Sequence, residues 1–336
     1  MTVSLRTALR SGKLLRAAGG HSALSARLAE EAGFDLIWSS GLEISATAGV
    51  PDANILTMSE FLEVAAAMAG AVSIPVLADC DSGFGNASNV AHMVRVYEAR
   101  GVAGICIEDK LFPKLNSFLD GDHELASPAD FAAKIRAAVE CRRSSELVVV
   151  ARIEALISGR GLDEALYRAR VYERAGADAL LIHSKQQDPE EVFAFRDRYR
   201  GELPVIVVPT TYHHVTTAEL ASRGFSMVIY ANHALRSSIM AMRQTFAKIM
   251  QDGTSENVET TIASLKEVFD LQGVQQMSER QERVEALGRE LTEVDGAAGS
   301  VPPAVFTKIA GQAPRIDRPQ GGPGLGSDPA ADAQAQ

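Results

Sequence analysis

Residues 172–184 read YERAGADALLIHS, in which a helical stretch ends at a glycine and a short apolar run follows almost at once. The same unit occurs at residues 28–41, 97–109 and 220–232. Each glycine suits the left-handed residue that ends a helix, and each apolar run is too short and too rich in β-branched residues to be another helix. The chain is therefore predicted to repeat a helix-to-strand unit.

Three further strand-like runs, at residues 73–81, 146–155 and 202–210, bring the predicted strands to seven. Apolar strands that alternate with helices indicate a parallel sheet covered on both faces. Seven or eight such units over about 250 residues favour a (β/α)8 barrel. A doubly wound open sheet is the alternative, but no GxGxxG motif follows the first strand. Amphipathic helices are expected at residues 57–70, 88–100, 128–141 and 163–175.

The C-terminal part differs in composition from this repeat. Two helical runs are predicted at residues 234–251 and 255–292, the second interrupted near Gly273. We expect the barrel with its helices to span residues 1–292 and an extension to span 293–336. From about residue 311 the extension is rich in Pro, Gly, Ala and Gln, which predicts disorder.

The overall composition excludes several classes of function. The 336 residues carry a net charge of −10 and contain no long cluster of Lys and Arg, so nucleic acid is not an expected partner. No apolar run reaches the roughly 18 residues of a membrane span, and the first residues lack the apolar core of a signal peptide. The three cysteines have no paired spacing. We expect a cytoplasmic protein without disulfides, a zinc site or a membrane partner.

Polar residues at the predicted strand ends are the candidates for function, because the carboxyl ends of barrel strands surround the active site. Asp79 and Asp81 are two residues apart and are expected on one side of a strand. The candidates, in chain order, are Ser40, Gly41, Leu42, Asp52, Asp79, Asp81, Glu108, Arg152, Glu154 and His183.

Each candidate also has a structural interpretation. Asp81 precedes Ser82-Gly83, a turn signal, His183 suits a buried core position, and Arg152 with Glu154 suits a structural ion pair. Taken together, however, carboxylates from neighbouring strands suit a hard divalent cation. Mg²⁺ keeps several waters, so one direct carboxylate is enough when others act through water. We favour this Mg²⁺ site over a purely structural cluster.

Residues 108–118 read EDKLFPKLNSF and begin an aperiodic stretch, 109–127, that ends at the helix-start signal Ser127-Pro128. Loops of this length in compact domains usually act as lids or are disordered. Here Lys114 and Asn116 can be delivered to a substrate, while Phe112 and Phe118 can seal the closed pocket. We predict a lid, with a mobile surface loop as the alternative.

These motifs resemble the phosphoenolpyruvate mutase branch of the isocitrate lyase superfamily, over residues 10–275. The resemblance implies a (β/α)8 barrel whose last helix is swapped between subunits, in a homotetramer built as a dimer of dimers. It also implies Mg²⁺, or Mn²⁺ in its place, near Asp79, Asp81 and Glu108, with Asp79 as the direct ligand. The motifs are SSGLEISA (39–46), DCDSGFGN (79–86), GVAGICIEDKLFPKLNSF (101–118), VARIEALISGRGLDEA (150–165), GADALLIHSK (176–185), VIVVPTTY (205–212) and MVIYANHALR (227–236).

The activity implied by the resemblance is an isomerase reaction of phosphonate biosynthesis that interconverts phosphoenolpyruvate and 3-phosphonopyruvate. Backbone amides and the hydroxyl at Ser40, Gly41 and Leu42 would hold the pyruvyl carboxylate. The transferring phosphoryl group would be held by Arg152, His183 and Asn116, with Lys114 assisting from the lid. Asp52 would lie near this group, either as a nucleophile or as an orienting charge.

Other activities remain open at this stage. One alternative is phosphonopyruvate hydrolase, which yields pyruvate and phosphate. The lid of that branch resembles a form with Thr where this chain has Asn116, as the mutases do. The motif PDANILTMS (51–59), however, is at least as similar to the hydrolases. Carbon–carbon lyases of the superfamily carry a lid cysteine that residues 109–118 lack. Oxaloacetate hydrolysis would use the same enolate chemistry without phosphorus. A non-catalytic scaffold would be expected to have lost at least one site residue, and all are present.

Overall fold

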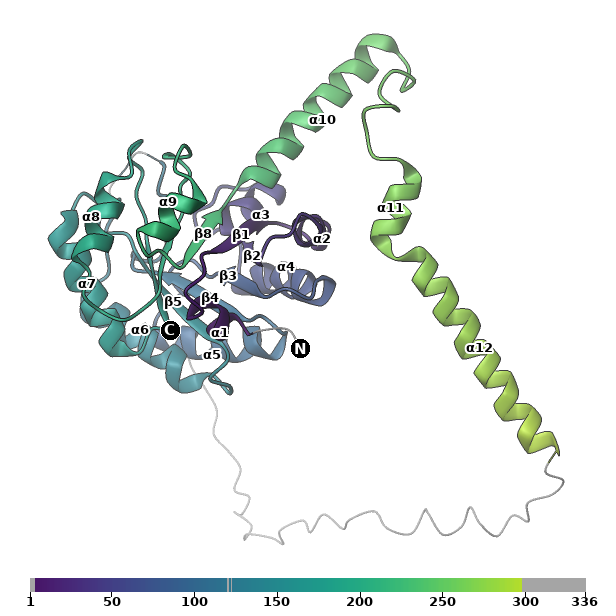
Figure 1. The fold of residues 1–336 in the computed structure, drawn as a ribbon, viewed down its shortest axis with the longest axis horizontal. Helices are drawn as coiled ribbons and strands as arrows, with labels where there is room; N and C mark the ends of the chain where they lie inside the picture. The colour runs from purple at the N-terminus through teal and green to yellow at the C-terminus, as the bar shows by residue number, and fades with distance from the viewer. Residues whose placement is uncertain (1–3, 120, 122, 298–336) are drawn as a thin grey trace, which may run out of the picture. The chain divides into compact units, whose positions relative to one another are not determined.

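The strands form a closed barrel in the computed structural model, which describes residues 4–297 except 120 and 122 (Figure 1). Each strand pairs in parallel with the next, and β8 pairs with β1 to complete the ring. The predicted (β/α)8 barrel is thereby confirmed and the open sheet is excluded. The strands are β1 Leu15–Gly20, β2 Leu36–Ser39, β3 Val76–Asp79, β4 Gly104–Glu108, β5 Val148–Ile153, β6 Ala179–Ile182, β7 Val205–Val207 and β8 Met227–Tyr230.

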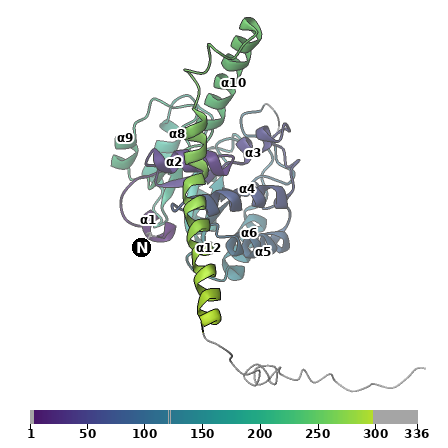
Figure 2. The ribbon, with the colours of Figure 1, turned by 90° about the vertical axis from the view of Figure 1, so that its right-hand side faces the viewer.

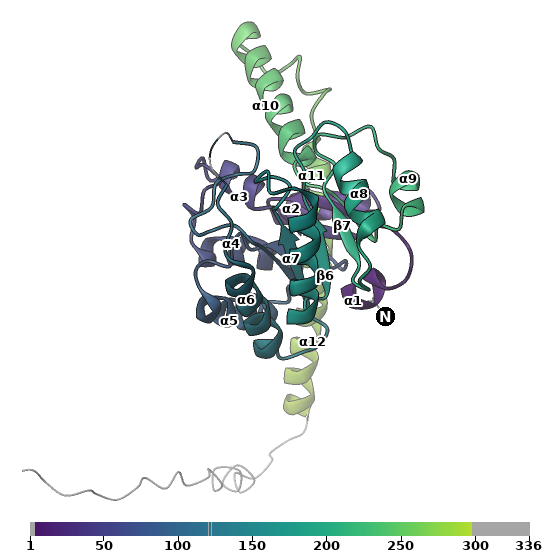
Figure 3. The same cartoon turned by 90° about the vertical axis from the view of Figure 1, so that its left-hand side faces the viewer.

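Helices surround the barrel and contact their neighbours, α2 with α4 and α5 with α6 (Figure 2), then α6 with α7 and α7 with α8 (Figure 3). The predicted helices agree with α4, α5, α6 and α7 to within two residues. The helices are α1 Leu5–Leu9, α2 Ala23–Glu31, α3 Gly41–Thr47, α4 Met58–Ala71, α5 Ala87–Ala99, α6 Pro128–Cys141, α7 Gly161–Ala175, α8 Glu190–Arg198, α9 Thr217–Ser222, α10 His233–Asp252, α11 Leu265–Gln272 and α12 Val274–Ala297.

Strand β1 is the one strand that the apolar runs did not reveal. Its sequence, LRAAGG, has no β-branched residue and ends in two glycines. A Cβ atom on Gly19 would lie 2.3 Å from the Ala231 carbonyl oxygen, so glycine is required where β1 approaches the segment after β8. Close approach between distant segments, not strand propensity, therefore explains this sequence.

The helix predicted at residues 255–292 is wrong over residues 255–264, whereas its predicted interruption near Gly273 is confirmed. Residues 255–264 form turns, and α11 begins after Ser264, whose hydroxyl accepts a hydrogen bond from the Glu267 amide. Gly273 adopts φ 71° and separates α11 from α12. The local capping signal at Ser264 sets the start of the helix.

The barrel interior is filled by alternate strand residues, including Trp38, Leu77, Val150 and Leu181, and Leu5 and Leu9 of α1 pack into the same cluster. A second apolar cluster lies between the strands and the surrounding helices. Because side chains alternate along a strand, each interior residue defines the side from which the residue two positions later projects. Residues two positions beyond the last interior residue of a strand therefore also face inward, at the carboxyl end of the barrel.

The chain divides into two units, Met1–Leu271 and Gln272–Gln336. The first holds the barrel with α10 and nearly all of α11, and the second holds α12. The predicted extension reaches the described residues only at the end of α12, and the predicted disorder from residue 311 lies outside them. Among the described helices, none combines the length and apolar character needed to cross a membrane.

Candidate active site

The inward side of four strands continues from apolar packing into charged side chains. Asp79 follows Leu77 of the interior cluster by two residues, Glu108 follows Cys106, Arg152 follows Val150 and His183 follows Leu181. Strand alternation therefore brings two acids, an arginine and a histidine to the carboxyl end of the barrel. This is the arrangement that the strand-end residues predicted.

A cavity of about 50 Å³ lies at this end of the barrel. Most of the predicted residues line it, although they come from separate loops and strands. Gly41, Asp81 and Glu108 do not line the cavity but contact residues that do. The predicted residues in its wall are Ser40, Leu42, Asp52, Asp79, Lys114, Asn116, Arg152 and His183.

Asp79 is buried with few hydrogen bonds. Its Oδ2 accepts a long 3.3 Å bond from the Gly41 amide, and its Oδ1 accepts one of 3.3 Å from the Asp81 amide. A Cβ on Gly41 would lie 3.1 Å from Asp79 Oδ2, so glycine permits this approach. Burial raises the pKa of Asp79, against the opposing effects of Lys114 and Arg152. The two cations therefore do not outweigh the effect of burial on this carboxyl group.

Asp81 and Glu108 complete the acidic group. Asp81 lies in a turn with φ 47°, so the predicted strand alternation stops at Asp79, where β3 ends. Burial raises the pKa of Asp81 to about 7, with Lys114 opposing this shift and Asp79 adding to it. Glu108 Oε1 is buried without a hydrogen-bond partner, with Lys110 Nζ 3.9 Å away, while Arg152 Nε lies 3.3 Å from Glu108 Oε2. The acidic group therefore contains a buried carboxylate oxygen that no hydrogen bond satisfies.

These acids fit a divalent cation that keeps much of its water. Among the described residues, no three His, Cys, Asp or Glu side chains are grouped to hold a metal ion by themselves. Mg²⁺ is commonly bound by one or two carboxylates together with several waters. The weakly bonded Asp79 and the unpartnered oxygen of Glu108 suit a direct and a water-mediated role, respectively.

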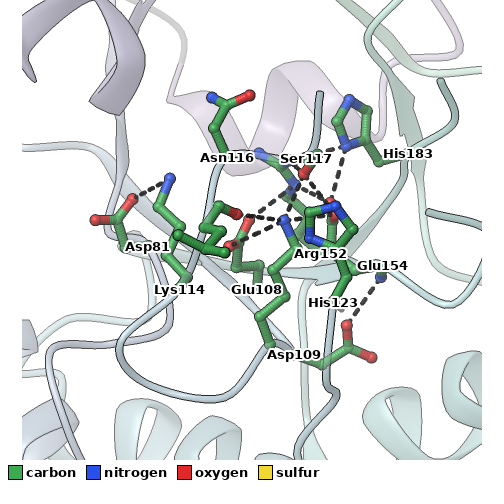
Figure 4. Close-up of polar contacts among 12 residues, drawn as sticks. Asp81, Glu108, Asp109, Lys114, Asn116, Ser117, His123, Arg152, Glu154 and His183 are labelled. Atoms are coloured by element: carbon green, nitrogen blue, oxygen red, sulfur yellow. Dashed lines mark hydrogen bonds and ion pairs between the residues drawn. The ribbon is translucent and has the colours of Figure 1, made fainter. Parts of the chain in front are cut away.

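The lid residues meet Asp52 in a buried contact. Lys114 Nζ lies 2.7 Å from Asp52 Oδ1 and 3.0 Å from Asp81 Oδ1, and Asn116 Nδ2 donates to Asp52 Oδ2 at 2.6 Å. Figure 4 shows Lys114 directed at Asp81. Burial opposes ionisation of Asp52, but Lys114 outweighs it and lowers the pKa of the carboxyl. Asp52 is thus an anion with a donor on each oxygen.

Glu154 organises the opposite wall of the cavity. Its Oε1 lies 2.5 Å from Arg152 Nε and 2.9 Å from His183 Nδ1, and its Oε2 accepts from Ser117 Oγ at 2.7 Å (Figure 4). Burial opposes ionisation of Glu154, yet Arg152, Lys110 and His183 hold its pKa well below the usual value. The predicted ion pair between residues 152 and 154 exists, and it orients an arginine that lines the cavity.

His183 is held as a neutral ring. Burial first, and the charge of Arg152 second, lower the pKa of its imidazole, although Glu154 acts in the opposite direction. Arg152 Nη2 also lies 2.8 Å from His183 Nδ1. Both close contacts use Nδ1, which leaves Nε2 as the nitrogen for a bound group. The interpretation of His183 as only a core histidine is therefore insufficient, since the ring also lines the cavity.

The lid aromatics differ from the prediction. Phe118 lines the cavity and packs edge-on against His183 with ring centroids 5.7 Å apart. Phe112 is half-exposed and is absent from the cavity wall, so its predicted sealing role is not borne out by its position. Of the two aromatic side chains, only Phe118 lies in the cavity wall.

Several cavity residues were missed by the sequence reasoning. Four of them follow the ends of β7 and β8, so strand alternation beyond these two strands was the available signal, whereas Trp38 lies within β2 and Ser117 lies in the lid. Val208 and Ala231 continue the inward side after Ile206 and Ile229. The missed wall residues are Trp38, Ser117, Val208, Thr210, Ala231 and Asn232.

Known proteins share this architecture and most of this length. The family described as "Phosphoenolpyruvate phosphomutase" matches residues 5–250. A phosphonopyruvate hydrolase of Variovorax sp. (strain Pal2) is 49% identical over 276 residues, which cover 82% of this chain and 95% of the relative.

Two solved structures agree with the same assignment. The phosphoenolpyruvate phosphomutase of Streptomyces platensis subsp. rosaceus is 55% identical, with a TM-score of 0.82, and the match covers 83% of this chain and 97% of that one. A phosphonopyruvate hydrolase in complex with oxalate and Mg²⁺ is 48% identical, with a TM-score of 0.78 and coverage of 84% and 96%.

Proposed function

The chain belongs to the phosphoenolpyruvate mutase/isocitrate lyase superfamily, in the branch that holds phosphoenolpyruvate mutases and phosphonopyruvate hydrolases, and we propose that it acts as the mutase. In this proposal the enzyme interconverts phosphoenolpyruvate and 3-phosphonopyruvate, the step that forms the C–P bond in phosphonate biosynthesis. The mutase and the hydrolase differ in what receives the phosphoryl group, namely carbon or water.

The observation that carries the proposal is the environment of Asp52. Lys114 and Asn116 donate to its two oxygens at 2.7 and 2.6 Å, and its pKa is lowered. A carboxylate in this state is a poor general base for activating water, because the donors and the low pKa both disfavour proton uptake. This supports transfer of the phosphoryl group within the substrate over its hydrolysis.

The substrate carboxylate would be held at the start of α3. Ser40 Oγ accepts a 3.3 Å bond from the Glu43 amide, which leaves its hydroxyl hydrogen to donate to the substrate. The Leu42 backbone amide would add a donor beside it, and so would the Gly41 amide, whose bond to Asp79 Oδ2 is long at 3.3 Å. Mg²⁺, or Mn²⁺ in its place, would be held directly by Asp79 and through water by Asp81 and Glu108, and it supplies positive charge for the enolate that forms as phosphoryl leaves.

The phosphoryl group would be held by the opposite wall. Arg152, fixed by Glu154, provides positive charge, while His183 and Asn116 provide uncharged contacts. A metaphosphate-like group is stabilised mainly by positioning and by charge around its oxygens, and water must be excluded while it moves from oxygen to carbon. Phe118 and Lys114 in the closed lid supply that exclusion, and Asp52 orients the lid without becoming covalently bonded.

Phosphonopyruvate hydrolase is the second candidate, because the Variovorax relative of that name is 49% identical over most of both chains. The carbon–carbon lyases are less consistent with the site. Cys80 and Cys106 are buried in and beside the barrel strands and Cys141 ends α6, so no cysteine of the described residues lies in the lid.

The test is ³¹P NMR of the purified protein with phosphonopyruvate and Mg²⁺. The proposal predicts a phosphoenolpyruvate signal without inorganic phosphate, and inorganic phosphate together with pyruvate would instead identify the hydrolase. Asn116→Thr removes one donor from Asp52, so we expect it to release a fraction of the phosphoryl group as phosphate. A variant that still forms only phosphoenolpyruvate would contradict the role given to Asn116.

The functional form is proposed to be a homo-oligomer in which α10 packs against a second subunit. Helix α10 has no buried residue and exposes Met240, Met242, Phe246 and Met250. Apolar groups of this number on one exposed helix are typical of an interface. Light scattering coupled to gel filtration distinguishes the proposed dimer of dimers from a dimer or a monomer.

A further inference from the structure

Asn54 connects the acidic group to the lid through both ends of its side-chain amide. Its Nδ2 donates to Asp81 Oδ2 at 2.6 Å, and its Oδ1 accepts the Lys114 backbone amide hydrogen at 2.6 Å. The residue lies in the loop between α3 and α4 and belongs to neither of the groups that it joins. One side chain thus ties a strand-end acid to the segment that carries Lys114.

The backbone at Asn54 is suited to this connection. It adopts φ 55°, in the left-handed region that non-glycine residues seldom occupy and that asparagine tolerates best. Two residues earlier, Asp52 receives the Lys114 ammonium group. The same short loop therefore binds Lys114 twice, at its side chain through Asp52 and at its backbone through Asn54.

The base of the lid is held by separate contacts. The Ala126 amide donates to the Asp109 carbonyl at 2.9 Å, and the Leu111 amide donates to the Glu124 carbonyl at 3.0 Å. Arg168 Nη1 further binds Asp109 Oδ2 at 3.0 Å. These bonds fix both strands of the lid base without involving Asn54, so opening of the segment around Lys114 requires only the contacts beyond them to break.

We propose that Asn54 is a positioning residue that latches the lid in its closed position over the acidic group. It fixes the Lys114 backbone so that the ammonium group reaches Asp52 and Asp81 together. The inference deepens the proposed function, because the latch keeps water from the phosphoryl group during transfer. The latch consists of the two contacts of Asn54, whichever reaction the site performs.

The first measurement is hydrogen–deuterium exchange of residues 110–118 in the full chain, with and without oxalate and Mg²⁺, the pair that a solved hydrolase relative binds. We expect protection in the wild type on adding oxalate and Mg²⁺. Asn54→Gly keeps the left-handed backbone and removes both bonds, so we expect at least about tenfold less protection, because one net hydrogen bond alone can account for up to about that factor.

Two further variants make the result specific. Asn54→Asp keeps an acceptor for the Lys114 amide but places a carboxylate against Asp81, so residues 110–118 should also lose protection. This variant tests the latch if Asn54→Gly does not fold. Ile55→Ala, at an exposed neighbour in the same loop, should retain wild-type protection. Wild-type protection in both Asn54 variants, or equal loss in the Ile55 control, would overturn the latch.

The second measurement separates the latch from a general structural role. With phosphonopyruvate as substrate, the Asn54 variants should lower kcat by about tenfold while KM changes less, and should release more phosphate per phosphoenolpyruvate formed. If residues 110–118 lose protection but the ratio of phosphate to phosphoenolpyruvate stays unchanged, the proposal that the latch excludes water is overturned. If the wild type itself hydrolyses phosphonopyruvate, the mutase proposal fails, whereas the exchange result still decides the latch.

Discussion

The two ends of the barrel both gather carboxylates and arginines, but they satisfy them differently. At the amino end, Asp178 receives Arg6 Nη1 at 2.7 Å, Arg142 Nη1 at 2.5 Å and the Val149 amide at 2.9 Å. At the carboxyl end, Glu108 Oε1 is buried without a hydrogen bond, and Asp81 Oδ1 has only the Lys114 ammonium group at 3.0 Å. Both oxygens of Asp178 are thus satisfied within the fold, whereas one oxygen of Glu108 is not.

This difference indicates what each end is for. A buried carboxylate oxygen without a partner costs free energy, so its retention among the acids that surround the cavity suits a site that a ligand completes. In barrels of this type the amino end serves stability and the carboxyl end serves the reaction. The contrast leads to opposite predictions for an aspartate at each end.

The largest expected effect is on activity at the carboxyl end. Asp79→Ala should lower kcat/KM by about a thousandfold, because the direct ligand of the cation would be lost. The temperature of unfolding should stay the same or rise, since Asp79 makes only two bonds of 3.3 Å in the fold. Steady-state kinetics and calorimetry of the same preparation test both parts. Near-normal turnover, or turnover without added metal, would contradict the Mg²⁺ site.

The corresponding change at the amino end should reverse this result. Asp178→Ala leaves Arg6 and Arg142 without their shared acid, and the free energy of unfolding should fall by about 3 kcal/mol. Turnover per folded molecule should remain normal at temperatures well below unfolding. Urea denaturation and kinetics check this prediction. A loss of activity at full stability would show that the two ends do not divide their roles in this way.

Much of the barrel is readable from local sequence. Seven strands follow from short apolar runs, four of them directly after helix-ending glycines, and alternation along the strands leads from the interior to Asp79, Arg152 and His183. Strand β1 escapes this reasoning because the contact between Gly19 and the segment at Ala231 joins distant parts of the chain. Local patterns cannot register such an approach.

The parts of the site that the sequence could not predict lie in the loops. Lys114 and Asn116 were recognised by residue type and by resemblance, but their convergence on Asp52 depends on how the lid folds across the barrel. Asn54 was missed because its role follows from a left-handed backbone and from two contacts with distant residues. Asp81 was placed on the strand, although β3 ends before it.

The smallest expected effect tests whether the carboxyl end holds a neutral histidine. Burial and Arg152 lower the pKa of His183 in the fold, whereas the unfolded chain binds the proton with a pKa of about 6.5. As the pH falls below 6.5, the unfolded chain is protonated first and the folded protein loses stability. Relative to His183→Gln, the wild type should therefore lose about 1 kcal/mol between pH 7.5 and pH 5.5.

Urea unfolding of both proteins at the two pH values measures this difference. The contributions of the other titrating groups are common to both proteins and cancel in the comparison. If the wild type instead gained stability relative to His183→Gln at low pH, the folded pKa would be above 6.5. The pairing with Glu154 at 2.9 Å would then dominate over burial. In that case His183 would hold the phosphoryl group as a cation alongside Arg152.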